Sequence, residues 1–226
     1  MKANTNTYTV TQVRTEAPGI QTLSLDGVPL FTPGQFINIF FPDTNTPEGK
    51  AYSLSSTPQE GAEITIKEIG EFSGKLCRMR EGDTFEASDP YGFFYPEYED
   101  SDLVLLAGGI GVTPFKGIIE QALKTNPKRP VTLLHSVRLQ EECIFDECFS
   151  KLDIEREYFV TRDQNVRLGA HPRRMNAEDV LRHKREGKQT EILICGSIDF
   201  TRSLWRELRE NGVSEDELYT EAFFSH

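Results

Sequence analysis

The stretch "LVLLAGGIGVTPF", residues 103–115, joins a short apolar run to three glycines and a helix start. The run suits a buried strand, and Thr113 and Pro114 are typical of a helix N-cap and a first helical turn. Glycines at such a junction let a diphosphate approach the backbone, while the helix N-terminus supplies amide donors. The alternative is a tight turn without a ligand, because G-G-x-G is not the full dinucleotide fingerprint.

Outward from this stretch toward the C-terminus, apolar runs alternate with helical patterns. The runs occupy residues 103–109, 131–136, 156–161 and 191–196, and the helical patterns occupy residues 113–124, 143–152, 176–184 and 201–210. This order predicts a parallel sheet with crossover helices, in which ligands lie beyond the carboxyl ends of the strands. Ser136 and Arg138 close one such strand, and Cys195 and Gly196 close another. Taken alone, Arg138 suits a solvated surface position and Cys195 a buried apolar one.

Before residue 98, apolar and polar residues alternate with a period of two. Short alternating segments bounded by turn residues predict an antiparallel barrel or sandwich. They cover residues 7–16, 20–27, 34–41, 62–70 and 83–90. A single helical segment in this half is predicted from Ser73, with Ser73 as its N-cap. The acidic stretch 95–102 separates the two patterns, so we predict domains at residues 1–98 and 99–226.

Composition narrows the class of protein. The chain has 226 residues with 25 basic and 36 acidic side chains, and its formal charge of −11 disfavours nucleic acid as a partner. Its apolar runs are too short for a membrane span and its start lacks a secretory signal, so we expect a cytoplasmic protein. The four cysteines form neither a disulfide framework nor an iron–sulfur pattern, because no third ligand follows Cys148, and no metal site is expected.

Several motifs occur in a characteristic order. They are K-A-Y-S at residues 50–53, G-E-F-S at residues 70–73, the glycine turn, C-G at residues 195–196 and E-A-F at residues 221–223. In this order the chain resembles the ferredoxin–NADP⁺ reductase superfamily, the two-domain FAD and NAD(P)H oxidoreductases, over nearly its whole length. The resemblance implies a six-stranded antiparallel β-barrel that binds FAD and a Rossmann-like parallel α/β domain that binds NAD(P).

The family's flavin motif is R-x-Y-S. The resemblance implies that Tyr52 stacks on the isoalloxazine and that Ser53 lies beside its N5 atom, roles that suit an aromatic face and a hydroxyl. Lys50 replaces the family's arginine and lacks the planar fork for phosphate, so FAD is expected to be held less tightly, or FMN or an exchangeable flavin used. The alternative for Tyr52 is an ordinary strand aromatic.

The resemblance also implies the other cofactor-binding residues. On the flavin side these are Lys50, Ala51, Tyr52, Ser53, Ile66, Lys67, Gly70 and Ser73. On the nucleotide side they are Gly109, Gly111, Thr113, Ser136, Arg138, Cys195, Gly196 and Phe223. The alternative for Phe223 is a plain apolar strand end.

The same resemblance implies three catalytic residues, Ser53, Cys195 and Glu221, where nicotinamide meets flavin. Glu221 is expected to aid orientation or proton balance. NADPH is favoured over NADH because Ser136 and Arg138 end the second strand of the nucleotide domain, where a cation suits a 2′-phosphate. Further arginines in this region are Arg167, Arg173 and Arg174.

The electron acceptor is expected to be a separate protein, such as a ferredoxin, a flavodoxin or an oxygenase component. Two alternatives are a reductase of free flavin or ferric chelates, and a non-catalytic subunit that binds flavin or nucleotide. An acidic carrier requires a local basic patch on a chain of this charge. The candidates are Lys67, Lys75, Arg78 and Arg80, which also suit an ordinary solvated face.

Overall fold

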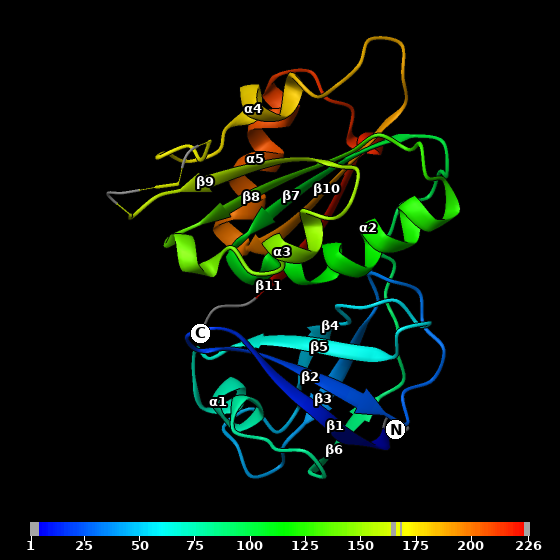
Figure 1. The fold of residues 1–226 in the computed structure, drawn as a ribbon, viewed down its shortest axis with the longest axis vertical. Coiled ribbons are helices and arrows are strands. Elements are labelled where there is room, and N and C mark those ends of the chain that lie inside the picture. The colour runs from blue at the N-terminus through cyan, green and yellow to red at the C-terminus, as the bar shows by residue number, and fades with distance from the viewer. Residues whose placement is uncertain (1–4, 164–165, 168, 224–226) are drawn as a thin grey trace.

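The computed structural model describes residues 5–163, 166–167 and 169–223, which form a barrel and an α/β layer structure joined by one linker (Figure 1). The barrel contains the chain's N-terminal half and the α/β part its C-terminal half, as the change of sequence period predicts. None of the helices in these ranges is long and apolar enough to cross a bilayer.

The N-terminal sheet is antiparallel throughout and has the strand order β4-β3-β6-β1-β2-β5. Its strands are β1 (Thr5–Ala17), β2 (Ile20–Asp26), β3 (Phe36–Phe40), β4 (Lys50–Ser53), β5 (Ala62–Lys67) and β6 (Thr84–Ser88). A bridge between Leu54 and Ile64 joins the two edge strands and closes the sheet. Alternate side chains such as Leu23, Ile37 and Ile39 fill the interior with no exposed surface. The predicted six-stranded barrel is therefore confirmed.

One helix, α1 (Glu71–Cys77), covers an end of the barrel through the buried ring of Phe72. Gly70 is its N-cap, so the prediction that Ser73 caps the helix is wrong. Ser73 lies in the first turn, where its hydroxyl oxygen accepts hydrogen bonds from the amides of Ile69 and Gly70 at 2.9 and 3.1 Å. The hydroxyl holds the turn that precedes the helix.

The C-terminal sheet is wholly parallel, with the order β11-β10-β7-β8-β9. Its strands are β7 (Asp102–Gly108), β8 (Val131–Val137), β9 (Glu155–Val160), β10 (Thr190–Ser197) and β11 (Leu218–Phe223). The chain order reverses between β7 and β10, and ligands in sheets of this kind bind in the crevice at that point. The predicted Rossmann-like arrangement is confirmed.

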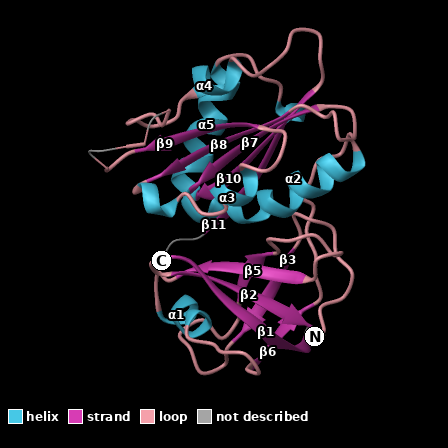
Figure 2. Ribbon diagram, viewed as in Figure 1, coloured by secondary structure: helices cyan, strands magenta, loops and turns pink. Residues whose placement is uncertain are grey.

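Helices cover both faces of this sheet (Figure 2). They are α2 (Thr113–Thr125), α3 (Asp146–Phe149), α4 (Ala177–Leu181) and α5 (Ile198–Glu210), with 3₁₀ turns η1 (Gly109–Val112), η2 (Gln140–Glu142) and η3 (Glu215–Glu217). α2 and α3 pack on the face toward the barrel, and α4 and α5 pack on the other. α3 is shorter than predicted, because Phe145 just before it has a left-handed φ of 63°. α5 begins earlier than predicted because Ser197 caps it.

A buried carboxylate fixes the linker between the two parts. Glu191 is 1% exposed and accepts hydrogen bonds from the amides of Glu97 and Tyr98 at 2.6 and 3.3 Å. The guanidinium of Arg129, also buried, pairs with the same carboxylate at 3.0 Å. The linker is thus anchored to the α/β part next to the predicted boundary at residues 98 and 99.

The two parts are in close contact. α2 lies against the barrel so tightly that a β-carbon at Gly117 would come inside 3.0 Å of the Ser56 carbonyl oxygen. An ion pair between Lys67 on β5 and Glu142 on η2 also crosses the junction. These contacts set edge strand β4 of the barrel opposite the last strand of the chain, β11.

Candidate functional site

The three predicted catalytic residues meet at the junction of the two parts. Ser53, at the end of β4, is 4% exposed and donates a hydrogen bond from Oγ to Glu221 Oε1 at 2.9 Å. Glu221 lies on β11 directly beside Cys195 on β10, its partner in the parallel register. The structure therefore brings together residues that lie more than 140 positions apart in the sequence, since Ser53 and Cys195 are 142 residues apart.

Burial governs the chemistry of both acidic groups. It raises the pKa of the Glu221 carboxyl, and the hydrogen bond from Ser53 offsets only part of that effect. Cys195 has no exposed surface, and burial raises the pKa of its thiol well above the ordinary value. A thiol packed among Leu105, Leu193 and other core side chains stays protonated, so it is poorly suited to act as a base.

The side chains of Lys50 and Tyr52 on β4 lie beside helix α1. The ring of Tyr52 lies parallel to that of Phe72, with their centroids 6.2 Å apart, and the Nζ atom of Lys50 lies 5.9 Å from the Phe72 centroid. Phe72 belongs to the first turn of α1, whose leading amides lack partners within the helix. The Lys50 ammonium and the N-terminus of α1 therefore both lie beside Tyr52. Ala51, between Lys50 and Tyr52 in the sequence, is exposed. Ile66, on β5, is buried in the barrel core.

The glycine turn follows β7 at the point where the strand order reverses. A β-carbon at Gly108 would come inside 3.0 Å of the Phe200 ring, and one at Gly111 would do so with the Cys195 carbonyl oxygen. Gly196 is closely packed in the same way, against Phe200. Gly109 differs, because its φ is +56° and nothing lies within 4 Å of its β-carbon position. Packing explains Gly108 and Gly111, whereas Gly109 alone faces open space.

The start of α2 differs from its prediction. The 3₁₀ turn η1 runs directly into the helix, so Val112 takes the capping position and Thr113 is the first helical residue, 2% exposed. The prediction of Thr113 as the N-cap is therefore wrong, while Pro114 does lie in the first turn. Three closely spaced glycines suit many turn geometries, so the 3₁₀ turn η1 was not predictable from the sequence.

The turn after β8 is ordered by Glu142, an acidic residue that was not predicted from the sequence. Glu142 Oε2 accepts hydrogen bonds from the amides of Arg138 and Leu139 at 3.1 and 3.4 Å, while Oε1 pairs with Lys67. Burial opposes ionisation of Glu142, but the hydrogen bond and charge of Lys67 and the two amides outweigh it and lower the pKa. The one sequence feature that could have indicated this role is the position of Glu142 four residues after Arg138, at the end of the strand.

The arginines predicted near this turn have different surroundings. The Arg138 side chain is exposed and forms no ion pair within the described ranges. Arg167 bonds to Asp146 at 2.6 Å, and Arg173 bonds to Asp179 at 2.6 Å. Arg167 and Arg173 are thus neutralised. Arg138, which lies beside half-buried Ser136, is exposed without an ion pair among the described residues, as are Arg162 and Arg174.

The candidate basic patch is largely neutralised by ion pairs. Three of its four members pair with carboxylates: Lys67 with Glu142, Lys75 with Asp43 and Arg78 with Glu68. Ion pairs of this kind leave little net charge to attract an acidic carrier.

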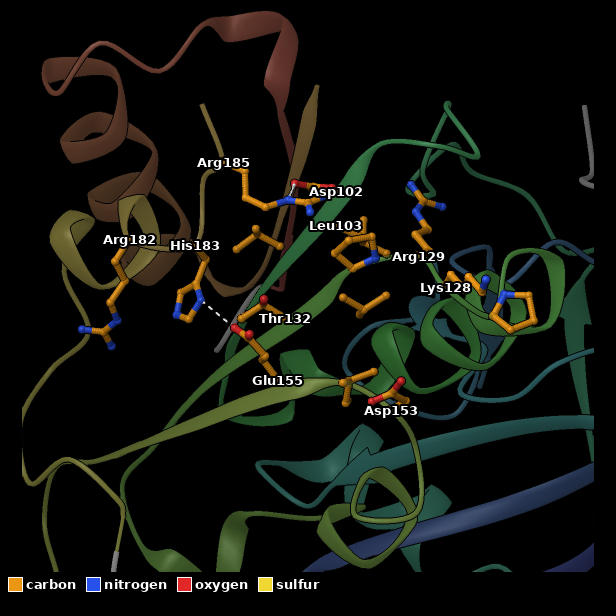
Figure 3. Close-up of a pocket in the computed structure, with 15 residues that line it drawn as sticks. Asp102, Leu103, Lys128, Arg129, Thr132, Asp153, Glu155, Arg182, His183 and Arg185 are labelled. Atoms are coloured by element: carbon orange, nitrogen blue, oxygen red, sulfur yellow. Dashed lines mark hydrogen bonds and ion pairs between the residues drawn. The ribbon is translucent and has the colours of Figure 1, made fainter. Parts of the chain in front are cut away.

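A groove of about 380 Å³ lies at the opposite edge of the parallel sheet, by the amino ends of β7, β8 and β9 (Figure 3). Several of its charged side chains pair with one another, as Arg185 does with Asp102 at 2.6 Å and His183 with Glu155 at 3.0 Å. The groove is separate from the meeting point of Ser53 and Glu221. No cluster of metal-ligating side chains occurs among residues 5–163, 166–167 and 169–223.

Comparison with known proteins agrees with this geometry. A family model for the oxidoreductase NAD-binding domain matches residues 105–204, from β7 into α5. Among solved structures, a ferredoxin NADP⁺ reductase from Neisseria gonorrhoeae with bound FAD and NADP is similar, with a TM-score of 0.82 and 24% identity over 99% of this chain and 100% of that one. This likeness confirms the two-domain fold.

Curated relatives cover most of the chain at low identity. A flavohemoprotein of Bordetella pertussis is 25% identical over 221 residues, which cover 86% of this chain and 53% of the relative. The toluate 1,2-dioxygenase electron transfer component of Pseudomonas putida is 26% identical over 222 residues, which cover 92% of this chain and 63% of the relative. The chain thus spans only about half to two thirds of the length of these relatives.

The packing of the glycine turn predicts unequal effects of two similar substitutions. Gly111→Ala should lower the free energy of unfolding by about 3 kcal/mol, because its methyl group overlaps the backbone of β10. Gly109→Ala should lower it by about 1 kcal/mol, because only the left-handed backbone opposes the change. Urea unfolding of both variants measures the difference, and equal losses would contradict this account of the turn.

The raised pKa of Glu221 predicts a pH-dependent effect on stability. As pH rises past the ordinary carboxyl pKa, the unfolded chain ionises Glu221 freely while the folded chain resists, so the folded state loses stability. Glu221→Gln removes that loss, so its melting temperature should rise relative to wild type between about pH 4 and pH 8. Glu210→Gln, which makes the same change at an exposed position, is the control. A difference that does not depend on pH would show that burial of Glu221 is unimportant.

Proposed function

We propose that this chain is a member of the ferredoxin–NADP⁺ reductase superfamily and an FAD-dependent NAD(P)H oxidoreductase that passes electrons to a separate protein acceptor. The observation that carries the proposal is the hydrogen bond between Ser53 and Glu221. It sets the proposed flavin strand directly opposite the strand ends of a nucleotide-binding domain. A functional pairing of two cofactors requires such a junction.

The residues on the barrel side fit a flavin. Tyr52 offers an aromatic face that is partly buried against Phe72, and Ser53 offers a hydroxyl beside it. Lys50 lies beside the start of α1, where a diphosphate would find both a positive charge and amide donors. Ser73 supports this site by holding the Gly70 turn rather than by offering a free hydroxyl.

The residues on the other side fit a nicotinamide nucleotide. Gly109 leaves room for a diphosphate, Ser136 and Arg138 lie at the end of the neighbouring strand, and Gly196 closes the next strand. Bound FAD would supply the redox chemistry, accepting a hydride from the nicotinamide and releasing electrons singly or in pairs.

The protein's own contribution is positioning and the control of water and protons. Ser53 donates to Glu221 and can turn its hydroxyl to a flavin nitrogen, since a hydroxyl both donates and accepts. Glu221 has a raised pKa, so it can retain a proton at the junction. Cys195 lies beside it on β10, and its buried side chain helps to exclude water.

The acceptor is proposed to be a separate electron-transfer protein, of the ferredoxin, flavodoxin or oxygenase-component type. Support comes from the similarity to the toluate 1,2-dioxygenase electron transfer component and to flavohemoproteins. Because Lys67, Lys75 and Arg78 are ion-paired, a docking site for an acidic carrier at those residues is disfavoured.

A second candidate function is the reduction of free flavin. It rests on Lys50, because a single ammonium holds a diphosphate less firmly than the forked guanidinium of arginine. Purified protein that is yellow and releases FAD on denaturation would support the first function. Colourless protein that reduces added flavin with NAD(P)H would support the second. A protein that oxidises neither nucleotide, with or without flavin, would contradict both.

Ser53→Ala tests the role of the serine. Loss of one hydrogen bond to a charged or reacting group costs about 1.5 to 3 kcal/mol, so flavin reduction in anaerobic stopped flow should slow by about tenfold or more. Ser24→Ala on β2 makes the same change away from the junction and should leave the rate unchanged. An unaltered rate in Ser53→Ala would remove Ser53 from the proposed site.

Arg138 is proposed to select NADPH over NADH. Arg138→Ala should lower kcat/KM for NADPH by about tenfold, the cost of one charged hydrogen bond, and leave that for NADH nearly unchanged. Arg80→Ala on the barrel is the matched control. A strong preference of the wild-type protein for NADH would overturn the assignment.

A further inference from the structure

A fully buried histidine lies directly behind the glycine turn. His135, on β8, has no exposed surface and is the register partner of Ala107 on β7. Its Nε2 atom lies 2.9 Å from the carbonyl oxygen of Gly109. Because a carbonyl oxygen only accepts, Nε2 must carry the proton and donate it. Burial lowers the pKa of His135 to about 4, so the ring is neutral near pH 7.

Folding alone gives little reason for a histidine here. Its second ring nitrogen, Nδ1, is buried and has no hydrogen-bond partner among the described protein atoms. Leaving such an atom unpaired costs about 1 to 3 kcal/mol, which an apolar side chain would avoid. The neighbouring residues on the strand, Leu133 and Leu134, are apolar and fully buried. The polar ring is better explained by the one hydrogen bond that it makes.

That hydrogen bond acts on the one glycine of the turn that faces open space. Gly109 has a left-handed φ of +56° with its β-carbon position unobstructed. Since its carbonyl oxygen is bonded to a buried ring, the negative end of this peptide group points into the domain. A carbonyl turned outward would instead present negative charge to an approaching phosphate.

We propose that His135 is a positioning residue for the nucleotide site. Its Nε2–H holds the Gly109 carbonyl inside the domain and so keeps the turn in the conformation that admits an anionic diphosphate. This inference rests on the proposed function, because it assumes that residues 108–113 bind the diphosphate of a nicotinamide nucleotide.

The test measures binding of ADP-ribose, which carries the diphosphate but no nicotinamide, by isothermal titration calorimetry on the full chain. His135→Leu removes the donor and should raise the Kd by about five- to tenfold, as loss of one buried hydrogen bond implies. His135→Gln keeps an N–H donor at a similar reach and should stay within about twofold of wild type. The limiting rate at saturating NADPH should change little, so the effect appears in KM rather than kcat.

Thr190→Val is the matched control. Thr190 is also buried on the parallel sheet, and its hydroxyl likewise has no partner among the described atoms, but it lies at the far end of β10. Its removal should leave ADP-ribose binding unchanged. If His135→Leu does not fold, His135→Met, which is unbranched, replaces it in the same comparison with His135→Gln.

The outcomes are distinct. Unchanged ADP-ribose binding in the leucine or methionine variant would overturn the role of His135 while leaving the proposed function intact. Equal weakening in His135→Gln and His135→Leu would show that the shape of the ring matters rather than its donor, and would also overturn it. Failure of the wild-type protein to bind ADP-ribose would overturn the proposed nucleotide site and this inference together.

Discussion

The hydrogen bond between Ser53 and Glu221 is the contact on which the functional arrangement depends. It forms only if the edge strand of the barrel lies opposite the last strand of the parallel sheet. That alignment is secured elsewhere, by the close approach of α2 to the barrel at Gly117 and by the linker anchored on Glu191. Rigid packing away from the site thus fixes two side chains that belong to different parts of the chain.

A second constraint acts where β7 and β10 end side by side. Gly111 approaches the backbone of Cys195 so closely that no side chain fits, and Phe200 occupies the space above Gly108 and Gly196. These three glycines are therefore required mainly by close packing. Gly109, whose carbonyl oxygen is hydrogen-bonded to His135 and whose β-carbon position is unobstructed, is left as the place where a ligand can approach the backbone.

The sequence predicted the two fold classes because these depend on local patterns, whereas the candidate site residues came from the resemblance to the reductase superfamily. Period-two alternation predicted an antiparallel barrel or sandwich, and apolar runs alternating with helices predicted the parallel sheet. The starts of the helices were less predictable. Ser73 and Thr113 are residue types that typically cap helices, but the structure has Gly70 and Val112 at the capping positions. Contacts across the fold could not be predicted: Glu142 pairs with Lys67, which lies 75 residues earlier, and the expected basic patch is neutralised in the same way.

The central claim is that flavin and nucleotide meet between the barrel edge and the carboxyl ends of the parallel strands. A crystal structure of the chain with FAD and NADP⁺ bound tests it most directly. The account predicts an isoalloxazine ring against Tyr52 and Ser53, with Glu221 within hydrogen-bond distance of the cofactors and the nucleotide diphosphate at Gly109. A nucleotide bound instead in the groove at the amino ends of β7, β8 and β9, or a flavin that does not contact β4, would contradict it.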